Sequence, residues 1–319
     1  MLSRVAENLY WMGRYVERAE NTARLVLATS QLHMEAGGKA RLPWAELLRI
    51  MGLDQHAPLA ALGNDDGPAI RYLTEDEDNP SALIASLHQA RENARSVREM
   101  LPSEAWESLN SLYLMAKEHL QEGRSDADRS QTLRNIILQR MALAGILHET
   151  MSHDVAFLFV RLGEMLERID MTSRIIDLTT AARQAKEVGE PLGDGGGWMN
   201  VLRALGAYPM YRRHVGVQVV PQSVVAFLFG DSHFPRSIRY CLNLLEESLG
   251  QLPLPAQTRG PLRAVASNLR TEDIHDLDTL HQRIDQLQID LGKLHQRIYD
   301  QYFALRAAPV MAAVEQPQA

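Results

Sequence analysis

The sequence predicts an all-α protein, a helical bundle built from two tandem homologous halves with pseudo-two-fold symmetry. Three observations predict this fold. Apolar residues recur at three- and four-residue steps over most of the chain. No segment of any length alternates apolar and polar residues as a half-buried strand does. Phrases of the first half return in the same order in the second. With 319 residues, 45% of them apolar, the chain can bury a large core.

The helices of the first half follow from this periodicity and from end signals. Residues 3–35 carry one apolar stripe, and Ser3 can cap the helix that they predict. Residues 43–52 begin with Pro43 and end with Gly52, which predicts a short helix. The stretches "GNDDGP" and "TEDEDNP" predict an acidic loop over about residues 54–80. Further helices are expected over 81–101, 102–123 and 125–149.

The second half shows the same pattern of helices and end signals. Residues 151–188 predict another long helix, which ends at "GEPLGDGGG". The tail after residue 306 has no helical pattern, so we expect it to be flexible. The remaining helices are expected over about 197–206, 221–230, 235–249 and 276–306.

The repeat is most distinct in the two longest amphipathic helices. The phrase "GRYVERAENTAR" at 13–24 returns as "GEMLERIDMTSR" at 163–174. The identical pairs are Gly13/Gly163, Glu17/Glu167, Arg18/Arg168, Thr22/Thr172 and Arg24/Arg174. Two more matches follow in the same order, 44–52 with 198–206 and 94–101 with 235–242. The sequence therefore predicts a first half over 1–149, with the acidic insertion at about 54–80, a second half over 150–306, and a flexible tail over 307–319.

Composition excludes several classes of protein. A net charge of −7 argues against nucleic-acid binding, which needs a basic surface, and against docking on anionic membranes. The single cysteine, Cys241, excludes an intramolecular disulfide and a thiolate metal cluster. Charges interrupt the first 15 residues, and no window approaches the length of a membrane span, so we expect no signal peptide and a cytoplasmic protein.

The glutamate of the first Glu-Arg pair lies on the polar side of its helix. At 100° per residue, Glu17 projects away from the apolar stripe, while Arg14, Asn21 and Arg24 share its side. Arg18 points to a flank between the two faces. This pattern is compatible with a solvated face, with a ligand or active site, or with a buried network between the halves.

The second Glu-Arg pair repeats the arrangement. Glu167 and Arg174 lie opposite the apolar side of their helix. A buried Arg-carboxylate network would fix the register of the two halves and would make the loss of one member costly. In that interpretation the expected pairs are Glu17 with Arg168 or Arg174, and Glu167 with Arg18 or Arg24.

A set of arginines is the best candidate for an anion-binding site. Arg91, Arg95 and Arg98 stack on one helix face, and Arg236 and Arg239 echo the last two in the second half. Guanidinium groups in a row can hold a phosphate or a peptide carboxylate. The alternative, which we favour, is pairing with neighbouring acids.

A group of histidines and acids where the halves meet is a weaker candidate. His148 and His153 are spaced by five residues, which points them about 140° apart on one helix. A helix-borne metal pair prefers spacings of three or four. We therefore expect helix capping by His148, Glu149, His153 and Asp154, and we predict neither a metal site nor a cofactor.

The phrases "NLYWMGRYVERAENTARLV" and "GEMLERIDMTSR" resemble the alpha-E family of bacterial all-helical proteins, which is named for its ER motif. The resemblance covers nearly the whole chain. It implies a genomic partnership with a circularly permuted ATP-grasp protein, and in some cases with a transglutaminase-like peptidase. ATP-grasp enzymes join a carboxylate to an amine through an acyl-phosphate.

Two further classes of function stay open beside this implied partner role in an amidoligase system, which would not need catalysis by this chain. The first is an enzyme in which glutamate acts as a general base and arginine clamps a carboxylate. The second is a helical module that binds a small molecule or peptide. An open pocket with an unpaired Glu17 or Glu167 would favour chemistry, and saturated pairing would favour a structural centre.

Overall fold

The computed structural model describes residues 2–35, 44–53, 66–120, 125–184, 196–253, 256–267, 276–277 and 279–304. Within these ranges all regular structure is helical, which confirms the all-α prediction. The expected tail 307–319 lies outside the described residues. In the described part no helix combines the length and the apolar character that crossing a lipid bilayer requires.

The helices of the first half are α1 (Ser3–Glu35), α2 (Trp44–Ile50), α4 (Asp66–Thr74), α5 (Leu83–Ser96), α6 (Ser103–His119) and α7 (Asp126–Thr150). Those of the second half are α8 (Val155–Gln184), α9 (Gly196–Ala204), α10 (Tyr208–His214), α11 (Pro221–Gly230), α12 (Ile238–Gln251), α13 (Ala256–Ser267) and α14 (Leu280–Ile298). A 3₁₀ turn, Arg98–Met100, follows α5, and a π turn, Tyr299–Phe303, follows α14.

Three segments differ from the expectation. The predicted acidic loop contains α4, because Ile70 and Leu73 give residues 66–74 a buried apolar side that the flanking acids obscured; residues 54–65 lie outside the described residues. Helix α10 is only seven residues long, too short for a periodic signal. Helix α13 was not expected; it contains Pro261, and proline usually ends or kinks a helix.

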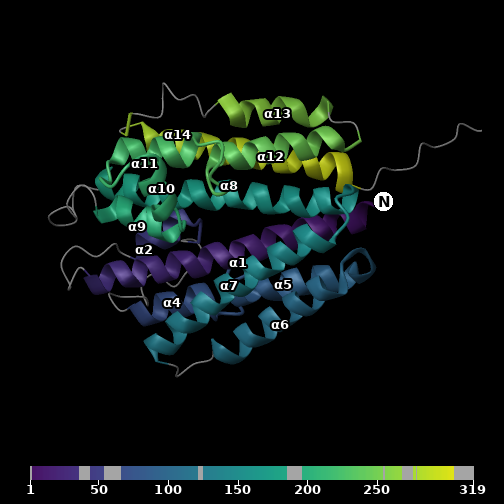
Figure 1. Ribbon diagram of the computed structural model, residues 1–319, viewed down its shortest axis with the longest axis horizontal. Helices are drawn as coiled ribbons and strands as arrows, with labels where there is room; N and C mark the ends of the chain where they lie inside the picture. Colours follow the sequence, from purple (N-terminus) through teal and green to yellow (C-terminus); the bar gives the residue numbers. More distant parts are fainter. Residues whose placement is uncertain are drawn as a thin grey trace, which may run out of the picture.

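The long helices α1 and α8 form the centre of the molecule and run side by side in the same direction (Figure 1). Helices α5, α6 and α7 lie on the α1 side, and α12, α13 and α14 lie on the α8 side. Apolar side chains from both groups join in one continuous buried core. Side chains that project between α1 and α8 therefore have helices on both sides.

Two glycines allow α1 and α8 to approach closely. A Cβ atom on Gly13 would lie 2.4 Å from the carbonyl oxygen of Val160. On Gly163 it would lie 2.0 Å from the carbonyl oxygen of Tyr10. Backbone cannot yield as a flexible side chain does, so only glycine fits at both positions. The side chains one turn further along, those of the two Glu-Arg pairs, consequently meet across the crossing.

Candidate functional site

The two Glu-Arg pairs engage each other across the α1–α8 crossing. Arg168 donates from Nε to Glu17 Oε1 at 2.9 Å and from Nη2 to Glu17 Oε2 at 2.7 Å. Arg18 donates from Nε to Glu167 Oε1 at 2.6 Å and from Nη2 to Oε2 at 3.1 Å. Both contacts are bidentate, the geometry in which arginine binds a carboxylate most strongly. Each glutamate thus meets the arginine of the other Glu-Arg pair.

Glu17 is the more heavily paired of the two glutamates. Arg140 of α7 donates to its Oε2 at 2.5 Å, and Arg236 donates to its Oε1 at 3.1 Å. Asn21 also donates to Oε1, at 3.0 Å. The Glu17 side chain is fully buried. Burial alone would raise the pKa of Glu17, but Arg140, Arg168 and Arg236 outweigh it and hold that pKa well below its ordinary value.

Two further carboxylates complete this first centre. Glu20 contacts Arg24 at 2.7 Å, Arg140 Nε at 3.0 Å and the guanidinium of Arg236. Glu164 accepts from Arg140 at 3.0 Å, and burial raises its pKa. We name this group the Glu17 centre; its members are Glu17, Glu20, Asn21, Arg24, Arg140, Glu164, Arg168 and Arg236.

Glu167 has fewer partners and a different setting. Besides Arg18, only Arg14 donates to it in the described part of the chain, from Nε to Oε2 at 2.7 Å. Burial alone would raise the pKa of Glu167, but Arg18 and Arg14 lower it to about 2. Arg14 lies over the ring of Trp11 at 5.2 Å, and Arg18 lies over Tyr15 at 5.5 Å. We name Arg14, Arg18 and Glu167 the Glu167 centre.

An aromatic cluster borders the Glu167 centre. The hydroxyl of Tyr10 and Nδ1 of His295 form a hydrogen bond of 2.8 Å. Burial, with the nearby charge of Arg14, lowers the pKa of His295 to about 4, so its imidazole is neutral at pH 7. Burial raises the pKa of Tyr10 to about 12. Trp11 and Phe303 pack against the same rings.

The last two residues expected at the site lie at its edge. Arg24 and Arg174 each pair with an acid one turn earlier on their own helix, Glu20 and Asp170 respectively. Among the contacts of the described residues, neither arginine pairs with the glutamate of the opposite Glu-Arg pair. Helix α2 packs against α8, and α9 packs against α1 as well as α8, so each short helix reaches the long helix of the other half. We call α2 and α9 the exchanged helices. Helix α9 ends beside Arg24 and α2 ends beside Arg174, and each of these arginines pairs within its own helix.

The ends of the exchanged helices approach the same arginines. Gly52, after α2, and Gly206, after α9, adopt left-handed backbone with φ of 72° and 62°. A Cβ on Gly52 would lie 3.6 Å from Arg174 Nη1, and one on Gly206 would lie 3.1 Å from Arg24 Nη1. The two termini also share a backbone pattern, since Leu53 and Ala207 donate five residues back, at 2.8 and 2.7 Å.

The arginines considered for anion binding do not form one group. Arg236 belongs to the Glu17 centre, on the α8 side of α1. Arg91 donates to Asn110 and Glu92, and Arg95 donates to Glu92, on the α5–α6 side. Arg98 lies over Trp106 at 5.4 Å. Arg239 also has an interaction partner.

Sequence reasoning missed Arg140, Glu20 and Glu164 as members of the Glu17 centre. For Arg140 a signal was present. The buried positions of α7 recur at three- and four-residue steps, and Arg140 occupies one of them. The series is Leu133, Ile136, Arg140, Leu143 and Leu147. A charged residue within an apolar stripe requires a buried counter-ion, so this pattern indicates a carboxylate opposite α7.

The histidine and acid group between α7 and α8 serves the helix ends. Nε2 of His153 approaches the carbonyl oxygen of His148 at 2.9 Å, at the end of α7. Asp154 accepts from the backbone N–H of Ala156 at 2.8 Å, at the start of α8. Glu149 lies 3.3 Å from Nδ1 of His148. The contacts of His153 and Asp154 satisfy backbone groups that helix ends leave without intrahelical partners, whereas the contact between Glu149 and His148 joins two exposed side chains and caps no backbone group.

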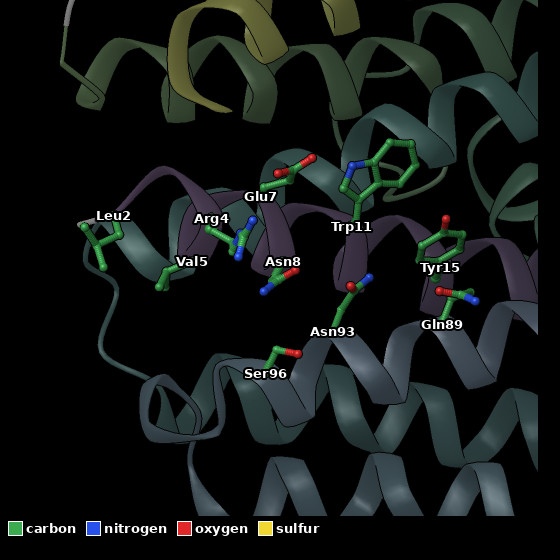
Figure 2. Close-up of a pocket in the computed structure, with 10 residues that line it drawn as sticks. All are labelled: Leu2, Arg4, Val5, Glu7, Asn8, Trp11, Tyr15, Gln89, Asn93 and Ser96. Atoms are coloured by element: carbon green, nitrogen blue, oxygen red, sulfur yellow. The ribbon is translucent and has the colours of Figure 1, made fainter. Parts of the chain in front are cut away.

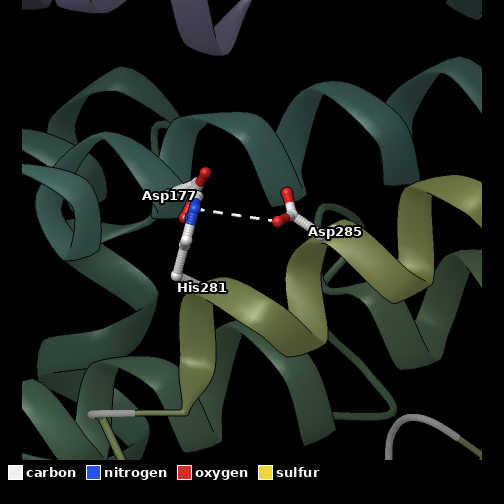
Figure 3. Close-up of side chains that lie close together, drawn as sticks. All are labelled: Asp177, His281 and Asp285. Carbon is white, nitrogen blue, oxygen red and sulfur yellow. Dashed lines mark hydrogen bonds and ion pairs between the residues drawn. The ribbon is translucent and has the colours of Figure 1, made fainter.

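A different histidine and acid cluster appears only in the structure (Figure 3). Asp177 of α8 lies 2.8 Å from Nδ1 of His281, and Asp285 of α14 lies 3.7 Å from its Nε2. One imidazole and two carboxylates are a donor set that a divalent cation can use. A protonated imidazole between two carboxylates satisfies the same geometry without a metal. In either state the cluster ties α14 to α8.

Comparisons with known proteins agree with this architecture. The chain is 27% identical over 312 residues to the uncharacterised proteins Mb2597 of Mycobacterium bovis and Rv2567 of Mycobacterium tuberculosis, a match that covers 91% of the chain. The match covers 34% of those relatives, so the chain spans about a third of their length. No solved structure matches.

The family comparison accounts for nearly all of the chain. The model of the Alpha-E family, described as a predicted alpha-helical domain with a conserved ER motif, matches residues 1–303. The Glu-Arg pairs that meet across α1 and α8 suit that description. The chain therefore belongs to the Alpha-E family.

Proposed function

We propose that this protein is a helical partner subunit of an ATP-grasp amidoligase system, and that it does not catalyse a reaction itself. In this proposal the two Glu-Arg centres form a rigid structural middle, and the outer helices present surfaces to the ligase. The ATP-grasp partner is the one that the family resemblance implies. A transglutaminase-like peptidase is a second partner in the proposal, and the cytoplasm, where ATP is available, is its location.

The observation that carries the proposal is the saturation of the glutamates. Glu17 accepts hydrogen bonds from three arginines and an asparagine, and it is fully buried. A general base works best with a pKa near the operating pH, whereas the pKa values of Glu17 and Glu167 are held low. Neither carboxylate is thus suited to accept a proton from a substrate near pH 7.

The length of the relatives supports an accessory role. The matched region occupies 34% of the mycobacterial proteins, so there it is one part of a much longer chain. In the proposal, this helical region works together with a further domain, on the same chain or on a separate one.

We further propose that the two halves arose by duplication. Reciprocity of the contacts supports this. Gly13 and Gly163 each abut the backbone of the other long helix, and Glu17 and Glu167 each bind the other copy's arginine. The short helices α2 and α9 end in the same way, and each packs on the long helix of the other half. Such exchange is what a fused, helix-swapped dimer would show.

The direct test is reconstitution with the ATP-grasp protein encoded beside this chain in its host. We expect a stable complex by size-exclusion chromatography with light scattering, and a changed rate of ADP release when this protein is added. Absence of both a complex and a rate change would overturn the partner role.

A folded Glu167→Gln variant separates the partner role from catalysis. If that variant stimulates the ligase as the wild type does, the non-catalytic interpretation is supported. If it folds, binds the ligase and yet abolishes product formation, the enzyme interpretation replaces ours. Circular dichroism and thermal melting establish that the variant is folded before either conclusion is drawn.

A further inference from the structure

A groove of about 760 Å³ lies between the first half of α1 and the second half of α5 (Figure 2). It is separate from the saturated centres. Asn8 of α1 faces Asn93 and Ser96 of α5 across it, while Trp11 lies on the upper flank of α1. Its volume falls within the range of about 300–1,000 Å³ that ligand sites in proteins usually have.

Most polar side chains of the groove have no partner in the described part of the protein, apart from Ser96, whose hydroxyl donates to the carbonyl oxygen of Glu92. The side-chain amides of Asn8, Gln89 and Asn93 make no hydrogen bond to another group in the described part of the protein. Likewise, neither Arg4 nor Glu7 has an ion-pair partner there. This contrasts with the arginines of the two centres, which are all engaged. Polar groups that line a concavity without partners are available to a ligand.

The kinds of polar group restrict the ligand class. Arg4 and Glu7 balance each other, so the groove has neither the positive surplus that phosphates need nor the acidic surplus that metal ions need. A carboxamide offers both donors and acceptors. Three of them in one groove match a ligand that presents donors and acceptors in alternation, which is the pattern of a peptide backbone.

The spacing of the groups supports the same class. Gln89 and Asn93 are four residues apart on α5, and so are Arg4 and Asn8 on α1, which is a rise of about 6 Å. An extended chain repeats side-chain direction every two residues, or about 6.6 Å. Successive side chains of each helix can therefore serve alternate residues of an extended peptide.

The far end of the groove is aromatic. Trp11 and Tyr15 stack with their ring centroids 5.4 Å apart, and both are partly exposed. Arg14 lies over the ring of Trp11 and Arg18 lies over the ring of Tyr15, both from the Glu167 centre. Rings fixed in this way can receive an apolar or aromatic side chain without a large loss of conformational freedom.

We infer that the α1–α5 groove binds an extended peptide segment of about five residues, with an apolar or aromatic side chain placed against Trp11 and Tyr15. The length follows from the distance between Arg4 and Tyr15, about 16 Å of helix, at about 3.3 Å per extended residue. This inference goes beyond the proposed partner role, because binding needs no ligase.

The test uses the isolated full-length protein and an equimolar library of N-acetylated pentapeptide amides, with retained peptides identified by mass spectrometry and titrated by calorimetry. We expect retained peptides to be enriched in one aromatic or large apolar residue. Asn93→Ala should weaken their binding at least tenfold with an unchanged circular dichroism spectrum. Gln131→Ala removes an exposed amide on α7, away from the groove, and should leave binding unchanged.

Three outcomes would overturn the inference. They are failure to retain any peptide, retention that Asn93→Ala does not weaken, and displacement of bound peptide by inorganic phosphate, which would indicate an anion site. Because the ligase is absent, failure here leaves the partner proposal standing. Failure of the reconstitution with the ligase likewise leaves the peptide groove standing.

Discussion

The Glu17 centre and the Glu167 centre contain the same pair of residues in the same relation across α1 and α8, but they differ in enclosure. Glu17 is fully buried and has arginines from α7, from α8 and from the turn before α12 around it. Glu167 is buried as well, but it is bound by two arginines of α1 alone, and one of them, Arg18, is 21% exposed.

This difference shows which contacts are common to both centres and which are particular to one. The bidentate pair is common to both centres, so it is the part that holds α1 and α8 in register. Arg140 and Arg236 have no counterpart around Glu167 in the described part of the chain, where aromatic rings surround the arginines instead. The Glu167 centre is thus the side of the crossing that borders solvent and the groove.

The largest effect is expected from Glu17→Gln. The variant keeps the shape of the side chain but leaves Arg140, Arg168 and Arg236 without their shared buried counter-ion. Breaking a buried ion pair in this way costs about 3–5 kcal/mol. Urea unfolding measures the loss. A loss below about 1 kcal/mol, the level of a surface pair, would contradict the structural role of this centre.

The next effect tests the crossing on which both centres depend. Gly163→Ala and Gly13→Ala each place a methyl group against backbone of the other long helix, and we expect a loss of about 3 kcal/mol or more from the displaced packing. Gly145→Ala is the matched control, because nothing lies within 4 Å of its position on α7. It should be neutral or stabilise by about 1 kcal/mol. Equal melting temperatures for all three variants would show that the helices tolerate separation.

Glu167→Gln should cost less than Glu17→Gln. It leaves two arginines rather than three without a counter-ion, and Arg18 is exposed enough for water to solvate it. We expect about 1.5–3 kcal/mol, the value of hydrogen bonds to a charged group. The same urea experiment ranks the two variants. The reverse order would mean that enclosure does not distinguish the centres.

The ends of the exchanged helices give a smaller, paired effect. Gly52→Ala and Gly206→Ala each force a side chain into left-handed backbone, at a cost of about 1–2 kcal/mol. Gly206→Ala should cost somewhat more, because Arg24 lies closer to the added carbon than Arg174 does at the other site. Thermal melting of the two variants measures this difference. Equal losses would mean that the arginines yield freely.

The smallest effect is a pH dependence confined to the Glu167 side. The pKa of His295 is lowered from 6.5 to about 4 in the folded protein, so the unfolded chain binds one more proton between these values. Stability should therefore fall as the pH drops from about 6.5 to about 4. His295→Gln keeps an acceptor for Tyr10 and removes this slope. Melting temperatures between pH 7 and pH 4.5 that fall equally in both proteins would assign the slope elsewhere.

Much of the fold could be predicted from the sequence, because long amphipathic helices and their end signals are local features. The central pairs of the site could also be predicted from a local feature. Because the Glu-Arg phrase occurs twice, each glutamate was expected to pair with an arginine of the other phrase. The parts that escaped prediction depend on tertiary contacts. Arg140 acts from a helix that carries no Glu-Arg pair, and α4 is hidden among acids that suggest a loop.

The groove could not be predicted either. Asn8 and Asn93 are ordinary polar residues of two helices, and only the packing of α5 on α1 brings them face to face. In contrast, the sequence placed Arg91, Arg95 and Arg98 on one helix face and indicated that Arg236 and Arg239 echo the last two in the second half. It could not indicate that α1 separates them into two groups, since that depends on which side of α1 each helix packs.

The parallel packing of α1 on α8 has a consequence for synthesis of the chain. Helix α1 is translated first, yet its partner begins only at Val155. At about 5–20 residues per second, α1 waits roughly 7–30 s until α8 is complete. During that time α5 and α7 can cover one side of α1, and Arg140 can pair with Glu17, but the face that packs on α8 has no native cover. The nascent first half is then a client for chaperones, and its two helices commit to the native crossing only after the second half has emerged.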